Sequence, residues 1–145
     1  MSVLVIYGHQ SVYKFYSIFI SALQLSVLKL TIMNNSPTFT LEEHKALTEL
    51  KEGIKGLLGE RMIKMVIYGS RARGDYEEES DIDIAIIVQG LTRELKGQIF
   101  DIVADIELKY LMPFSTLVLS EEQFESLRKR ERRIAIDIER EGVPI

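Results

Sequence analysis

The fold of this chain is decided by Gly69-Ser70-Arg71-Ala72-Arg73-Gly74-Asp75-Tyr76-Glu77-Glu78-Glu79-Ser80-Asp81-Ile82-Asp83, which joins two strand-like segments. The segment before it, Ile63 to Tyr68, is apolar apart from Lys64 and stops at a glycine. We therefore expect a buried strand that ends in a tight turn at Gly69. Open α/β sheets tend to bind ligands at the carboxyl ends of their strands, so this turn is a candidate ligand site.

The turn has the chemistry of a phosphate-binding loop. Gly69 has no Cβ, so a ligand can come close to the backbone, and Ser70 offers a hydroxyl and an amide to phosphate oxygens. Arg71 and Arg73 follow and can offer further positive charge to phosphates. These four residues are the predicted nucleotide-binding residues.

Two aspartates follow on the next strand-like segment. Asp81 and Asp83 are two residues apart, so both carboxylates face the same way while Ile82 and Ile84 enter the core. Like charges this close repel unless a cation lies between them, and hard oxygen ligands favour Mg²⁺. We predict that Asp81 and Asp83 are the metal ligands and catalytic residues of a nucleotidyl-transfer site. Each motif alone is common in solvated turns and strand ends, so their combination carries the prediction.

These residues resemble the signature of the minimal nucleotidyltransferases, small members of the DNA polymerase beta superfamily. That signature is Gly-Ser, ten residues, then Asp-x-Asp, and it is matched by Ile67 to Gly74 together with Ser80 to Ile84. The resemblance extends from Phe39 to Ile145. It implies an α/β fold with a small mixed β-sheet flanked by helices. It also implies that Gly-Ser grips the triphosphate of ATP and that the two aspartates hold Mg²⁺.

The resemblance further implies a protein partner. Many minimal nucleotidyltransferases are antitoxins to a HEPN-domain ribonuclease toxin, and some silence it by adding AMP to a toxin tyrosine. The expected function is therefore Mg-dependent transfer of AMP from ATP to a protein hydroxyl, within a hetero-oligomer with such a toxin.

One position departs from the superfamily's pattern. A third carboxylate usually lies on a later strand, where it acts as general base or completes the metal cage, but Phe114 to Leu119 contains none. Ser115 or Thr116 stands at the expected place. The alternative is thus an antitoxin with weak or no catalytic activity that neutralises its partner by binding alone. A third hypothesis is that the protein modifies a small molecule. The sequence argues against it, because it shows no extra helical domain that would enclose such a substrate.

Composition limits the remaining possibilities. With 145 residues, 46% of them hydrophobic, the chain is the size of one domain with a substantial core. A net charge of -4 gives no overall attraction to nucleic acid, and we expect no direct nucleic-acid binding. The absence of cysteine fits a cytoplasmic protein, and the two histidines lie in unrelated segments, which argues against zinc.

Residues 1–32 differ in character from the rest of the chain. Their apolar run, Phe15 to Leu28, is shorter than the roughly 20 residues of a membrane-spanning helix, so we expect no membrane anchor. Met33 directly precedes Asn34-Asn35-Ser36-Pro37, where the domain-like pattern begins. We therefore interpret residues 1–32 as an apolar extension that reflects a misplaced translation start, and residues 33–145 as the nucleotidyltransferase domain.

Helical patterns surround the central motif. Thr40 and Glu43 form a capping-box pattern before a helix that ends near Gly59, and Thr92 can cap a second helix that stops before Pro113. The segment 114–119 is the third expected strand, and Ser120 opens one final helix with Phe124, Leu127, Ile134 and Ile138 inward. The basic residues within 128–133 on that helix are interpreted as a solvated face with mixed-charge pairs, with docking of an acidic partner or of RNA as the alternative.

Overall fold

The computed structural model describes residues 39–77 and 80–145. The expected extension over residues 1–32 lies outside the described residues. Within the described part, no helix is both long and apolar enough to cross a membrane.

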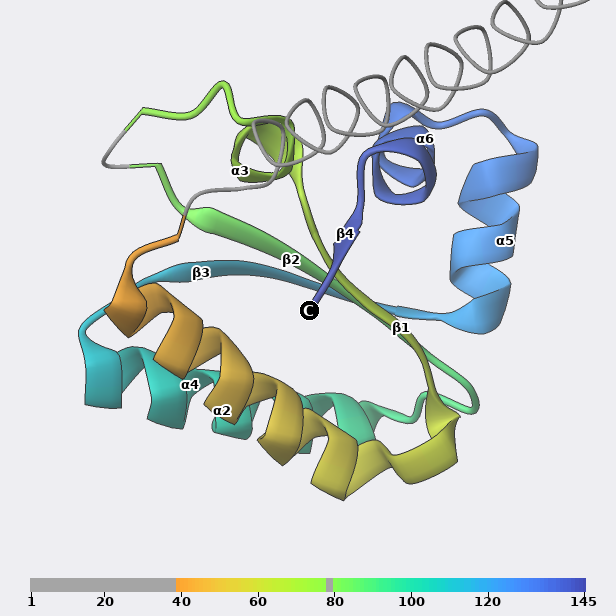
Figure 1. Cartoon of the computed structure of the whole chain (residues 1–145). Helices are drawn as coiled ribbons and strands as arrows, with labels where there is room; N and C mark the ends of the chain where they lie inside the picture. The colour runs from red at the N-terminus through yellow and green to blue at the C-terminus, as the bar shows by residue number, and fades with distance from the viewer. Residues whose placement is uncertain (1–38, 78–79) are drawn as a thin grey trace, which may run out of the picture. The chain divides into compact units, whose positions relative to one another are not determined.

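A four-stranded sheet forms the centre of the described part (Figure 1). Its strands are β1 (Met62–Tyr68), β2 (Ile82–Val88), β3 (Phe114–Ser120) and β4 (Val143–Pro144), and their order is β3-β2-β1-β4. β2 and β3 are parallel, whereas β1 pairs antiparallel with both β2 and β4. The sheet is therefore small and mixed, as the sequence predicted. The expectation of three strands was wrong, because the two-residue β4 is too short to leave an alternating pattern.

β4 pairs with only part of β1. Val66 lies opposite Pro144 and Ile67 opposite Val143, and the amide of Ile145 donates to the carbonyl of Met65. The amides of Val143 and Ile145 point to the same side of an extended chain, so the nitrogen of Pro144 points away from β1. Proline has no N–H, so this outward position of β4 offers no donor.

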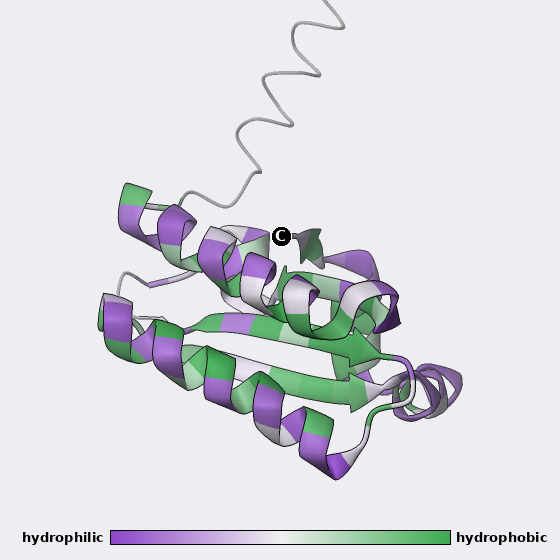
Figure 2. Cartoon of the chain, turned by 90° about the horizontal axis from the view of Figure 1, so that it is seen from below, coloured by the Kyte–Doolittle hydropathy of each residue, from purple (hydrophilic) through white to green (hydrophobic). Residues whose placement is uncertain are grey.

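Two long helices cover one face of the sheet. They are α2 (Leu41–Leu58), which is followed by the short 3-10 helix η1 (Gly59–Arg61), and α4 (Arg93–Tyr110). Both start as predicted: Thr40 and Glu43 form the full capping box, and the Thr92 hydroxyl accepts from the Leu95 amide. Figure 2 shows α2 and α4 in front of the largely hydrophobic strands. The larger core cluster lies between these two helices and the sheet. It includes Leu50, Ile54, Ile84, Ile86 and Ile99, all fully buried.

Two shorter helices cover the other face. They are α5 (Glu121–Lys129) and α6 (Arg133–Arg140), so the layers run helix, sheet, helix (Figure 1). The prediction of one continuous final helix was wrong. The chain leaves helical geometry between α5 and α6, where Glu131 has a φ of 49°. The break lets Phe124 from α5 and Ile138 from α6 enter one cluster with Val66, Ala85 and Ile87 of the sheet.

The basic residues around this break are exposed. Arg128 pairs with Glu125 of its own helix and with Glu139 of α6, and Arg133 pairs with Asp137. These mixed-charge pairs are what the interpretation as a solvated face predicted.

Candidate functional site

The predicted site lies where β1 ends and β2 begins. The two strands are antiparallel and Tyr68 lies opposite Asp83, so both halves of the sequence motif meet at one end of the sheet. The expected tight turn is instead the start of a short helix, α3 (Gly69–Arg73), which follows β1 without a connecting residue. Gly69 makes this change of direction with a φ of 74°, a region in which glycine is favoured.

Gly69 is in close contact with the Asp83 carboxylate. A Cβ placed on Gly69 would lie 2.5 Å from Asp83 Oδ2 and 3.3 Å from its carboxyl carbon. No other residue type can occupy this position without displacing the carboxylate, because real Cβ atoms essentially never come that close. The glycine thus allows the Gly-Ser element and the Asp-x-Asp element to touch.

The two aspartates differ in environment. Asp81 lies one residue before β2 and is exposed, whereas Asp83 is the second residue of β2 and is half-buried. Ile82 and Ile84 are buried in the larger core cluster, as the predicted alternation required. Among residues 39–77 and 80–145, no group of three His, Asp or Glu side chains is arranged to hold a metal ion. The metal-ligand prediction for Asp81 and Asp83 stays a prediction, and it depends on these two carboxylates alone.

The strand register decides which residue of β3 is the neighbour of Asp83. Asp83 lies beside Ser115, whereas Thr116 lies beside Ile84 and therefore on the opposite face. Of the two positions considered for the third carboxylate, Ser115 is the one on the aspartate face. Thr116 faces the larger core, where its hydroxyl is buried and has no hydrogen-bond partner among the described residues.

Tyr68 borders the same end of the sheet. Burial raises the pKa of its phenol, and the negative charges of Asp83 and Asp137 raise the pKa further. The phenol is therefore neutral at ordinary pH and can act as a hydrogen-bond donor beside the Asp83 carboxylate.

The two arginines of α3 have different partners. Arg71 is only 6% exposed and forms an ion pair with Glu43 of α2 at 3.2 Å. Arg73 is exposed and pairs with Asp75 at 3.2 Å and with Glu141 at 3.1 Å, and these carboxylates raise its pKa. Their predicted phosphate contacts stay predictions. In the structure both guanidinium groups are engaged by carboxylates of the chain itself.

Glu43 was not recognised as a residue near the site. The sequence identifies it as the third residue of a capping box, and it does accept from the Thr40 amide. A capping box, however, uses one carboxylate oxygen and says nothing about the second. The pairing of that second oxygen with Arg71, 28 positions later, has no local sequence signal.

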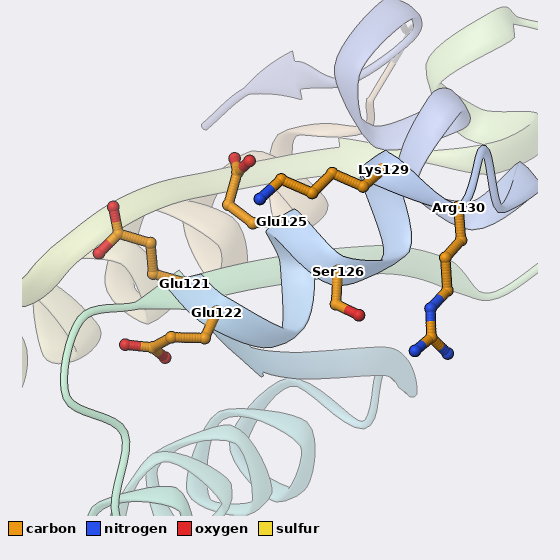
Figure 3. A pocket seen from close by; sticks show the side chains of 6 residues that line it. All are labelled: Glu121, Glu122, Glu125, Ser126, Lys129 and Arg130. Atoms are coloured by element: carbon orange, nitrogen blue, oxygen red, sulfur yellow. The ribbon is translucent and has the colours of Figure 1, made fainter.

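A surface depression of about 540 Å³ lies on α5, away from the predicted site (Figure 3). Its lining comes from one helix and its end and carries three carboxylates and two basic groups. Figure 3 shows these side chains spread outward along the helix instead of converging on one point. The candidate site is therefore defined by the Gly-Ser and Asp-x-Asp residues and not by this depression.

Comparison with known proteins agrees with the geometry. Residues 52–145 match the family model described as Polymerase beta, Nucleotidyltransferase. Two proteins of Methanocaldococcus jannaschii are similar: "Putative protein adenylyltransferase MJ0141" is 34% identical over 54% of this chain and 80% of its own length, and "Putative protein adenylyltransferase MJ0604" is 39% identical over 58% of this chain and 80% of its own length.

A solved structure, that of a "putative nucleotidyltransferase" from Sulfolobus solfataricus, is 21% identical and covers 74% of this chain and 87% of its own, with a TM-score of 0.38. The family match spans the sheet, the Gly-Ser element and the two aspartates. The chain belongs to the polymerase beta family of nucleotidyltransferases.

Proposed function

We propose that this protein transfers AMP from ATP to a hydroxyl group of another protein, with Mg²⁺ held by Asp81 and Asp83. The observation that carries the proposal is the contact between Gly69 and the Asp83 carboxylate. It brings a predicted phosphate-binding element within reach of a predicted metal-binding element, as transfer of a nucleotidyl group requires.

The donor groups at this end of the sheet fit Mg²⁺. This ion is usually bound through one or two carboxylates together with substrate phosphates and water, because it demands octahedral geometry and gives up water reluctantly. One exposed and one half-buried aspartate, two residues apart, meet that requirement. When bound, the ion would neutralise charge on the transferred phosphoryl group and hold the triphosphate.

The chain's own residues position the reactants in this proposal. The Ser70 hydroxyl and the backbone near Gly69 bind the triphosphate, and α3 is too short to act through a helix dipole. The acceptor hydroxyl oxygen bonds to the α-phosphorus as the bond to the bridging oxygen breaks. Pyrophosphate leaves, and the hydroxyl proton passes to solvent or to a nearby carboxylate.

The protein acceptor is supported by the relatives. Both M. jannaschii proteins carry the description "Putative protein adenylyltransferase", which names an adenylyl group as the transferred group and a protein as the acceptor. We propose that the acceptor of the present chain is also a protein. We further propose that this partner is a HEPN-domain toxin and that the two proteins bind in the cytoplasm.

A second candidate function is neutralisation of that partner by binding alone. The observation that favours it is Ser115, which stands beside Asp83 where a third carboxylate would act as base. Under this hypothesis Gly69, Ser70 and the two aspartates no longer catalyse.

The intact mass of the partner separates the two functions. The protein encoded next to this chain is co-purified and incubated with it, ATP and Mg²⁺. A gain of one or more adenylyl groups supports the enzyme, and a stable complex with unchanged mass supports binding alone.

The control is the double variant Asp81→Asn/Asp83→Asn, which should fold normally. We expect transfer to fall by about 10³-fold or more, because bound metal contributes several kcal/mol to the transition state. Retained transfer would refute the metal-site assignment.

A further inference from the structure

A buried ion pair lies behind the candidate site. Glu43 and Arg71 are 8% and 6% exposed, and they are the buried charged residues of the described part of the chain. Arg71 Nη2 lies 3.2 Å from Glu43 Oε1. The pair joins the first turn of α2 to α3, across 28 positions of the chain.

Both members of the pair also hydrogen-bond to the backbone. Glu43 Oε2 accepts from the Thr40 amide at 2.7 Å. Arg71 Nε and Nη2 both donate to the carbonyl of Ser80, at 3.2 and 3.1 Å. The guanidinium also stacks on the Tyr76 ring, with 4.2 Å to the ring centroid. Arg71 therefore holds Ser80, the residue directly before Asp81.

Arg71 thereby couples the two halves of the motif. It is in the same five-residue helix as Ser70, and it binds the carbonyl that precedes Asp81. Glu43 contacts the same guanidinium group. The start of α2, the helix α3 and the residue before Asp81 are thus joined through one planar group with a fixed donor geometry.

The pair is poorly explained by stability alone. Removing two charges from water costs several kcal/mol per ion, and neutral or apolar replacements of a whole buried pair are often as stable as the pair. What a guanidinium adds is a rigid fork that fixes the relative position of its acceptors.

We propose that Glu43 and Arg71 are positioning residues for nucleotidyl transfer: they fix Ser80 and Asp81 relative to the Gly69-Ser70 element. This rests on the proposed function, and it assigns Arg71 a task other than direct phosphate binding. Misplacement of Asp81 by an ångström is enough to slow transfer about 10²-fold, because catalysis here depends on geometry.

The test variant is Glu43→Gln/Arg71→Met. Glutamine keeps an oxygen for the Thr40 amide, and methionine fills the space of the arginine stem, so no unpaired charge remains buried. The matched control is Glu125→Gln/Arg128→Met, which makes the same two chemical changes at an exposed ion pair of α5, away from the candidate site.

The first measurement is hydrogen exchange of the Ser80 amide, which donates to the carbonyl of Glu77 at 2.9 Å. We expect exchange in the test variant to rise by about tenfold or more at an unchanged unfolding temperature, since the loop opens locally. The control should leave this exchange unchanged. Equal exchange in the test variant and the wild type would overturn the proposal, whether or not the protein transfers AMP.

The second measurement separates positioning from phosphate binding. We expect the test variant to lower kcat for AMP transfer by about 10²-fold with a change in the KM for ATP of less than about threefold. A raised KM with normal kcat would overturn the proposal and identify Arg71 as a phosphate ligand.

If the test variant does not fold, Arg71→Lys replaces it. Lysine keeps the charge but has no fork, so both readouts should move in the same direction, and a wild-type result would overturn the proposal.

Wild-type protein without any transfer would refute the proposed function and not the positioning role. Faster Ser80 exchange in the test variant would then still support a structural coupling between Arg71 and the loop.

Discussion

The sheet face toward α2 and α4 is apolar along most of its length, with Thr116 as a polar exception, whereas the face toward α5 and α6 carries its polar groups mainly at one end. The first face contributes Met65, Ile67 and four fully or nearly fully buried residues of β2 to the larger cluster. The second contributes Val66, Ala85 and Ile87 to the smaller cluster, then continues into Tyr68, Asp83 and Ser115.

This difference shows how one short sheet can both hold the core together and present polar groups at one end. Because side chains alternate along a strand, β2 can send isoleucines to one face and a carboxylate to the other within two residues. The larger cluster secures the fold. The second face can therefore leave one end open to polar groups at little cost in stability.

The largest effect should come from the apolar face. Ile86→Ala removes a fully buried side chain from the larger cluster and should lower the free energy of unfolding by about 2–5 kcal/mol. Leu117→Ala, on the second face, removes a half-buried side chain and should cost about half as much. Urea unfolding of both variants measures the difference. Equal losses would show that the two faces contribute alike.

The second prediction concerns the contact at the site. Gly69→Ala places a Cβ 2.5 Å from Asp83 Oδ2, and we expect AMP transfer to fall by about 10²-fold because the carboxylate is displaced. Gly74→Ala is the matched control. Its φ of 80° is close to the 74° of Gly69, and a Cβ there meets nothing within 4 Å.

Both glycine variants should lose about 1–2 kcal/mol of stability from the unfavourable backbone region, as thermal unfolding can measure. Only Gly69→Ala should lose AMP-transfer activity in addition to this stability. The contact would have no functional meaning if the two variants transferred AMP equally well.

The third prediction adds charge to the polar end. Ser115→Asp puts a carboxylate beside Asp83, and like charges opposite each other on neighbouring strands destabilise by about 0.2–1 kcal/mol. We expect Mg²⁺ to recover this loss, seen as a larger rise in unfolding temperature than Ser115→Asn shows. An equal rise in both variants would show that a carboxylate at position 115 adds nothing to the cation site.

The smallest effect is expected from Tyr68→Phe. The folded protein raises the pKa of Tyr68 above its ordinary value of 10.0, so the neutral phenol contributes stability that is complete below that pH and lost as pH rises through the folded-state pKa. The phenylalanine of the variant does not ionise, so the stability of the variant does not fall in this way. Its stability relative to wild type should therefore improve above about pH 10, which denaturant unfolding at several alkaline pH values tests. A constant difference across this range would contradict the assigned environment.

Sequence patterns predicted the parts of the fold that have local causes. The capping residues Thr40, Thr92 and Ser120 each begin a helix, and strands β1, β2 and β3 lie where apolar alternation placed them. The break between α5 and α6 was missed because it has no glycine or proline, and Glu131 adopts positive φ under tertiary packing.

The motif could be identified from the sequence, but the geometry around it could not. The spacing of Gly69, Ser70, Asp81 and Asp83 identified the motif, but only the strand register places Ser115 beside Asp83. The direction of a long side chain is not encoded by spacing. Arg71 therefore looked equivalent to Arg73, although it is buried against Glu43 and Arg73 is not.

The outward nitrogen of Pro144 bears on how copies of this protein behave at high concentration. Open sheet edges can recruit strands from other molecules and so start aggregation. At the β4 edge the proline offers no donor to an added strand. At the β3 edge the Phe114 amide donates to Glu107 at 2.7 Å and the Ser120 amide to Gln123 at 2.9 Å, so both ends of that strand are occupied by side chains. These contacts and the proline reduce the number of free donors that the two edges offer to strands of other molecules.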